Sequence, residues 1–151
     1  MKDNRGLSLI EIIVVIGILT VILSFGMLAD INAFKGDTLR SEQTTIVSTL
    51  QRARSHAMAN MFESTYGVCY NTGSYVIFHD GACDKLGSDE IISANANITT
   101  TFSTAPIVFD RLTGKLIPQL SPATNEVDIT VDSGNGVPKH IKVNNEGTIN
   151  W

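Results

Sequence analysis

The stretch Leu7–Ala29 reads LSLIEIIVVIGILTVILSFGMLA, 23 residues with a single charged side chain, Glu11. Its last 18 residues, from Ile12 to Ala29, carry no charge. A helix rises about 1.5 Å per residue, so this stretch would be roughly 34 Å long, enough to cross a hydrocarbon core of about 30 Å. The sequence therefore predicts a membrane-spanning helix over residues 7–29.

Two basic residues, Lys2 and Arg5, lie just before this run. By the positive-inside rule the N-terminus stays in the cytoplasm and the rest of the chain lies outside the cytoplasmic membrane, in the periplasm or at the cell surface. An ordinary cleaved secretory signal is the alternative, with Ser24-Phe25-Gly26 as an acceptable cleavage site. The length of the apolar run and the carboxylate near its start disfavour that alternative.

Glu11 is the residue that requires an explanation, because an ionised carboxylate in lipid is costly and usually has a partner. No Lys or Arg lies one turn away, so the positive charge has to come from another chain or from a new amino terminus. The alternative is that Glu11 reaches the headgroups from the edge of the membrane.

The order Arg5-Gly6-Leu7-Ser8-Leu9-Ile10-Glu11 resembles the class III signal of type IV pilins and pseudopilins. The resemblance implies that prepilin peptidase removes the leader, residues 1–6, between Gly6 and Leu7. Leu7 is then N-methylated, and its amine neutralises Glu11 of a neighbouring pilin or pseudopilin. At the position of Leu7 the family more often has Phe. This departure concerns only the expected methylation of Leu7 and not the cleavage.

A second helical segment is expected over residues 30–64. Polar residues around Lys35 and Asp37 predict a kink or restart there, with Asp37 or Thr38 as N-cap. Beyond it, apolar and small residues recur every three or four positions and predict a buried stripe. Its members are Leu39, Gln43, Ile46, Leu50, Ala53, Ala57 and Met61. Arg40, Arg52 and Arg54 are interpreted as a solvated face.

Residues 65–151 are expected to form an antiparallel β domain, because their apolar residues alternate with polar ones. The clearest predicted strands are 66–71 and 75–79, joined as a hairpin, 127–131 and 140–144. Shorter strands are expected at Phe102, 107–109, 116–117 and 147–151, with loops over 81–97. The fold class is α+β: a long N-terminal helix packed on an antiparallel sheet.

Three separate motifs narrow the resemblance to the GspH/FimT minor pseudopilins. Leu50–Met58, leading into Val68-Cys69, resembles that family's LxxARSxA stretch. Ile107–Phe109 followed by Gly114 is similar to IxFxxxG, and His140–Val143 followed by Gly147 is similar to its closing strand and GxI. The resemblance implies the pilin-like fold and a minor subunit of a type IV pilus or type II secretion pseudopilus.

Motifs of catalysis and of cofactor binding are absent from the sequence, so we expect no enzyme and no cofactor. His56, His79 and His140 have no metal-ligand spacing, and the acidic residues Asp80, Asp84, Asp89 and Glu90 lack the order of an EF-hand, so no metal site is expected. Cys69 and Cys83 would lie outside the cytoplasm, where a disulfide closing a 15-residue loop is favoured slightly over two free thiols.

DNA uptake or adhesion is the alternative function, since some FimT-type proteins bind DNA through a basic C-terminal surface. Removing Lys2, Asp3 and Arg5 from 11 basic and 15 acidic residues leaves 9 and 14, a net charge of −5. DNA binding would therefore need a local cluster of cations. The candidates are Arg111, Lys115, Lys139 and Lys142. Thr148 stands where the family often has its last arginine, which weakens this alternative.

Overall fold

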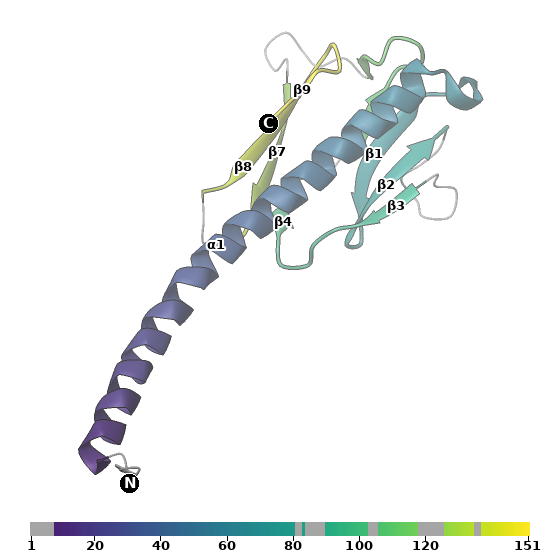
Figure 1. The fold of residues 1–151 in the computed structure, drawn as a ribbon. Coiled ribbons are helices and arrows are strands. Elements are labelled where there is room, and N and C mark those ends of the chain that lie inside the picture. The colour runs from purple at the N-terminus through teal and green to yellow at the C-terminus, as the bar shows by residue number, and fades with distance from the viewer. Residues whose placement is uncertain (1–7, 81–82, 84–89, 103–105, 118–125, 135–136) are drawn as a thin grey trace. The chain divides into compact units, whose positions relative to one another are not determined.

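The structure is a computed structural model that describes residues 8–80, 83, 90–102, 106–117, 126–134 and 137–151. Over residues 25–35 it describes the backbone alone. Contacts divide the chain into two units, Met1–Gly36 and Asp37–Trp151. The described part of the first unit is almost entirely helical, and the second unit holds the rest of that helix and all the described strands (Figure 1).

Helix α1 is assigned over Leu9–Met58 without a break (Figure 1). The expected restart of the helix at residues 32–37 is wrong, because the assignment runs through them. A single glycine such as Gly36 costs a helix only about 1 kcal/mol relative to alanine, and no proline removes a backbone donor there. The expected end near Glu63 is also wrong. Asn60 adopts a left-handed conformation with φ 53°, which ends the helix, and a short 3₁₀ turn, η1, follows at Met61–Glu63.

The first sheet has five antiparallel strands in the order β3-β2-β1-β5-β6. Their bounds are β1 Tyr66–Asn71, β2 Ser74–His79, β3 Glu90–Ser93, β5 Ile107–Phe109 and β6 Leu116–Ile117. The predicted hairpin is confirmed, since β1 and β2 pair from Tyr66↔His79 to Asn71↔Ser74. Its two turn residues, Thr72 and Gly73, have φ of 42° and 75°, as the tightest hairpin turns require.

The second sheet has four antiparallel strands in the order β4-β7-β8-β9. Their bounds are β4 Thr99–Thr100, β7 Glu126–Asp132, β8 Lys139–Asn144 and β9 Ile149–Asn150. The α+β class is confirmed, but the expectation of one sheet is wrong. Strand β3 occupies part of the region expected to be loop, and Phe102 follows β4 instead of lying in a strand.

One core joins the second half of α1 to both sheets. Leu39, Ile46, Leu50, Ala53 and Ala57 are buried, as the stripe predicts, and they belong to the same apolar cluster as residues of both sheets. The sheet members include Val68, Ile77, Phe109, Ile129, Ile141 and Val143. Met61 is 38% exposed, because the helix has ended before it. Figure 1 shows this part of α1 lying across the strands of both sheets.

A buried carboxylate fixes the helix to the first sheet. Glu42 is 6% exposed, and its Oε1 accepts hydrogen bonds from the hydroxyl of Tyr75 at 2.7 Å and from the backbone N–H of Asn95 at 3.2 Å. Burial raises the pKa of Tyr75 well above its ordinary value, and the hydrogen bond and negative charge of Glu42 raise it further. The phenol therefore stays protonated and remains a donor.

The outer face of the first sheet carries a second, smaller apolar cluster. It contains Cys69, Val76 and Phe78, with Cys83 and Val108 packed against it. The structure joins Cys69 to Cys83 in a disulfide whose Cα atoms are 6.0 Å apart. The side chain of Asn71 also donates to the carbonyl of Cys83 at 3.2 Å. Residue 83 is thus held against this outer face by a covalent bond and a hydrogen bond.

We predict that Tyr75→Phe lowers the free energy of unfolding by about 1–3 kcal/mol, because buried Glu42 loses its hydroxyl donor. The control is Tyr70→Phe, at a tyrosine that is 43% exposed on β1, with an expected change within about 0.5 kcal/mol. Urea denaturation at pH 7 measures both values. Equal losses in the two variants would contradict the role assigned to the Tyr75 hydroxyl.

The same pair of variants gives a pH dependence. In the unfolded chain Tyr75 ionises near its ordinary pKa of about 10, whereas the folded pKa is raised. The contribution of this group is therefore complete below about pH 10 and is lost as the pH rises through the folded pKa. Above pH 10, Tyr75→Phe is expected to lose less stability than the unsubstituted chain. Tyr70→Phe is expected to lose as much as the unsubstituted chain.

Candidate assembly and binding surfaces

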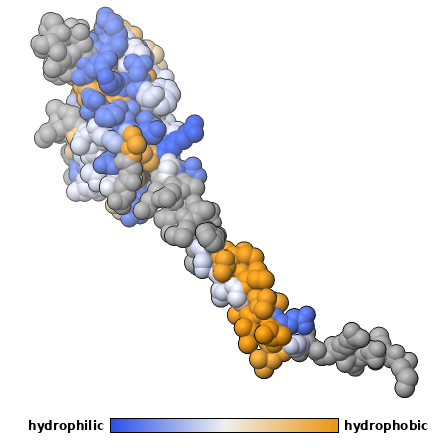
Figure 2. Space-filling view, turned by 90° about the vertical axis from the view of Figure 1, so that its left-hand side faces the viewer, coloured by the Kyte–Doolittle hydropathy of each residue, from blue (hydrophilic) through white to orange (hydrophobic). Residues whose placement is uncertain are grey.

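The described part of the first unit presents an uncovered apolar helix. The large apolar side chains from Leu9 to Leu23 are 48–77% exposed. Figure 2 shows them as a band of hydrophobic residues along this part of the helix. Exposed apolar surface of this extent on one helix indicates a surface that another molecule or a lipid phase covers.

The hydroxyl groups of Thr20 and Ser24 are satisfied by the backbone of this helix. The hydroxyl of Thr20 donates to the carbonyls of Ile16 and Gly17 at 3.0 and 2.8 Å, and that of Ser24 donates to Thr20 at 2.8 Å. Hydroxyls that bond back to the preceding turn need no external partner, as an apolar environment requires.

Glu11 lies in the first turn of α1, where its backbone N–H donates to Ser8 at 3.0 Å. No residue of the described ranges forms an ion pair with it. The expected leader, residues 1–6, and the expected cleavage pair Gly6 and Leu7 lie outside the described residues. Of all helices within the described ranges, none has the length and apolar character needed to cross a membrane.

In the second unit, Arg54 joins the ends of the two sheets. Its Nε donates to the carbonyl of Gly114 at 3.3 Å, and its Nη2 donates to the carbonyl of Glu146 at 3.1 Å. Gly114 precedes β6 of the first sheet, and Glu146 lies between β8 and β9 of the second. The interpretation of Arg54 as part of a solvated face is wrong. Its side chain, next to the buried stripe, contacts the ends of both sheets, and the sequence pattern does not show where those ends lie.

Two glycines, Gly114 and Gly147, pack against each other where Arg54 joins the two sheets. Gly114 and Gly147 have φ of 65° and 73°, and a Cβ atom placed on Gly147 would lie 1.9 Å from the carbonyl oxygen of Gly114. The backbone N–H of Leu116 donates to Asn145 at 3.0 Å beside them. Only residues without a side chain combine this conformation with this approach. Arg54, Gly114 and Gly147 come from three motifs that the sequence keeps 60 and 33 residues apart, and here they meet.

The four basic residues proposed for DNA contact differ in their partners. Lys115 pairs with Glu146 at 2.9 Å, and Lys142 pairs with Glu126 at 3.1 Å. The guanidinium of Arg111 donates to the carbonyl of Glu63 at 3.1 Å. Lys139 is exposed at the start of β8 and forms no ion pair with a described residue. Carboxylates therefore compensate two of these four charges.

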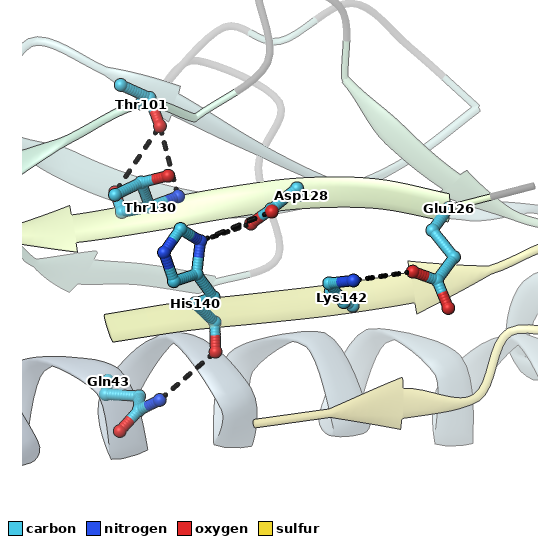
Figure 3. A network of polar contacts seen from close by, with 7 residues as sticks. All are labelled: Gln43, Thr101, Glu126, Asp128, Thr130, His140 and Lys142. Carbon is cyan, nitrogen blue, oxygen red and sulfur yellow. Dashed lines mark hydrogen bonds and ion pairs between the residues drawn. The ribbon is translucent and has the colours of Figure 1, made fainter. Parts of the chain in front are cut away.

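The outer face of β7 and β8 carries a row of these polar pairs (Figure 3). His140 Nδ1 lies 3.1 Å from the nearer carboxylate oxygen of Asp128. The hydrogen bond and charge of Glu126 raise the pKa of Lys142, and the charge of Asp128 raises it further. Among the described residues, no group of His, Cys, Asp and Glu could hold a metal ion. Asp84 and Asp89 of the acidic segment lie outside those residues.

The comparisons with known proteins give one match. Residues 1–27 match the family model described as the prokaryotic N-terminal methylation motif. The searches of curated proteins and of solved structures returned no significant match. The motif is a type IV prepilin-like signal, and it indicates a pilin-like or pseudopilin chain that prepilin peptidase processes. It also indicates a structural subunit, and it fits a membrane-anchored precursor that enters a filament with other pilins.

We predict that Gly147→Ala destabilises the second unit far more than Gly73→Ala. Both glycines have φ near 75°, so both variants place a side chain in the left-handed region at a cost of about 1–2 kcal/mol. At Gly73 the new methyl group meets nothing within 4 Å, whereas at Gly147 it meets the Gly114 carbonyl. The excess loss for Gly147→Ala is expected to be about 1–3 kcal/mol by urea denaturation. Equal losses would show that the junction is not closely packed.

Proposed function

We propose that this chain is a minor pilin or pseudopilin of the GspH/FimT type, a subunit of a type IV pilus or of a type II secretion pseudopilus. The match of residues 1–27 to the methylation motif carries this proposal. The meeting of Arg54, Gly114 and Gly147 supports the narrower assignment, because the residues that resemble that family form one structural junction. Such a junction explains why the three motifs occur together.

The proposed processing creates the group that Glu11 lacks. Prepilin peptidase hydrolyses the peptide bond between Gly6 and Leu7, and the released amine of Leu7 is then methylated. A methylated amine remains a cation at neutral pH, so it can pair with a carboxylate. In a filament this amine pairs with Glu11 of a neighbouring subunit, and a charge that is costly alone in an apolar environment becomes part of an ion pair.

The proposed organisation follows the apolar run. Residues 7–29 anchor the precursor in the cytoplasmic membrane, with the leader in the cytoplasm. Residues 30–64 hold the rest of α1, to Met58, and the short turn η1. The β domain, residues 65–151, then lies in the periplasm or at the cell surface. The disulfide between Cys69 and Cys83 supports this placement, because disulfides persist outside the cytoplasm.

The first test is cleavage in cells with and without prepilin peptidase. We predict that the mature chain begins at Leu7, carries one added methyl group and appears only when the peptidase is present. Intact mass and N-terminal sequencing of membrane fractions measure this. Gly6→Val is expected to block cleavage, and Gly17→Val, which leaves the leader unchanged, is the control. A soluble chain that begins after Gly26 or Ala29 would contradict the proposal.

The second test separates cleavage from assembly. We predict that Glu11→Gln, which keeps the size of the side chain and removes its charge, leaves cleavage at Gly6 intact. The amount of this subunit in sheared filaments should fall at least about tenfold, since the interchain ion pair is lost. Glu63→Gln, an exposed carboxylate in the second unit, is the matched control. Normal incorporation of Glu11→Gln would refute the role given to Glu11.

A further inference from the structure

A groove of about 650 Å³ lies in the second unit between the first turns of its helical part and strand β8. Arg40, Gln43 and Thr44 line it from α1, and Lys139, His140 and Trp151 line it from the second sheet and the residue that follows β9. Gln43, 8% exposed, donates from Nε2 to the carbonyl of His140 at 3.3 Å (Figure 3). The two walls of the groove are therefore joined by a nearly buried side chain.

Two cations of this groove have no ion-pair partner among the described residues. Arg40 and Lys139 are exposed and form no ion pair with a described residue, and no lining residue is acidic. Asp37, one turn before Arg40, does not pair with it. On the same strand, by contrast, Lys142 pairs with Glu126, and His140 of the groove lining pairs with Asp128. In a chain of net charge −4, two free cations on opposite walls of one groove favour a bound anion.

The groove also offers an apolar contact beside the cations. Trp151, the only tryptophan of the chain, is 66% exposed. Pro138 completes the lining, and the preceding Val137 is 82% exposed. An indole ring beside Arg and Lys is the combination found where proteins meet the headgroup layer of a membrane. The ligand should therefore join an anionic group to an apolar part.

We propose that this groove binds the phosphate of an anionic phospholipid headgroup, with Arg40 and Lys139 as its cationic contacts and Trp151 against the glycerol and the first acyl carbons. The inference rests on the proposed membrane anchoring. Arg40 follows Ala29, the end of the proposed anchor, by eleven positions along the chain. Long Arg and Lys side chains can extend several ångströms toward a headgroup layer. The precursor would thus use the groove at the membrane before it is assembled.

A lipid fits this groove better than a nucleic acid does. Single strands occupy sites of about 4–16 nucleotides and need cations along the whole path. Here the two free cations stand at one groove, and the adjoining outer face of β7 carries Glu126 and Asp128, whose carboxylates would repel a continuing phosphate backbone. One phosphate with an apolar neighbour matches the size and the charge of the lining.

The test uses the full chain in a nonionic detergent, with the fluorescence of Trp151 as a direct reporter. Dihexanoyl phosphatidylglycerol is titrated as the probe, and dihexanoyl phosphatidylcholine, which has no net charge, is the control lipid. We expect a saturable change in emission with phosphatidylglycerol and at least about tenfold weaker binding of phosphatidylcholine. Arg40→Gln/Lys139→Gln should weaken phosphatidylglycerol binding at least about tenfold, since each cation near an anionic lipid contributes separately.

The matched control is Arg52→Gln/Lys142→Gln, which removes two exposed charges outside the groove and should keep the affinity. If the double variant unfolds at a lower temperature than the parent chain, Lys139→Gln alone replaces it as the groove variant. Lys139 is exposed at the start of β8. Equal binding of both lipids, or no loss in the groove variants, would overturn the proposal. Displacement of the lipid by inorganic phosphate at equal affinity would also overturn the proposal, because it indicates a site for free phosphate. Tighter binding of oligothymidine would overturn it too, because it indicates a nucleic-acid site.

Cleavage by prepilin peptidase is measured on the same variants, since their substitutions lie outside residues 1–27. Normal cleavage without phosphatidylglycerol binding in the parent chain would overturn the lipid site and leave the proposed function standing. Absent cleavage in the parent chain would contradict the proposed function instead.

Discussion

The buried stripe of α1 is the interaction on which the globular unit depends. Its small and branched residues, from Leu39 to Ala57, belong to one apolar cluster with the inner faces of both sheets. Neither sheet has a second layer of its own among the described residues, so the helix supplies the apolar surface that each needs. Because both sheets pack on the same helix, their positions along it determine which loops and strand ends lie in contact.

The junction around Arg54 follows from that arrangement. Because both sheets pack on one helix, the end of the first sheet at Gly114 lies beside the turn of the second at Gly147. A half-buried guanidinium donates to carbonyls from each, so it satisfies acceptors that the strand ladders leave open. Glu42 performs a similar function near the opposite end of the stripe, where it accepts from Tyr75 and from the segment after β3.

Charge is distributed unevenly over the remaining surface. Among the described residues, carboxylates compensate Arg52, Lys115 and Lys142, and the guanidinium groups of Arg54 and Arg111 donate to backbone carbonyls. Arg40 and Lys139, which form no ion pair with a described residue, lie on the two walls of one groove. The uncovered apolar helix and this groove are separate surfaces, and each suits a different partner: other helices or lipid chains for the first, and an anionic headgroup for the second.

The sequence by itself determined the features that depend on neighbours along the chain. Periodicity located the buried stripe of α1, the hairpin of β1 and β2, and strands β7 and β8, because local spacing reports which side chains are buried. The spacing of Gly6, Leu7 and Glu11 likewise led to the prepilin-like signal. Tertiary structure decided the division into two sheets, the place of β3, the burial of Glu42, the role of Arg54 and the pairing of Lys115 and Lys142. These depend on partners 13 to 92 residues away, and periodicity specifies that a face is covered without specifying which segment covers it.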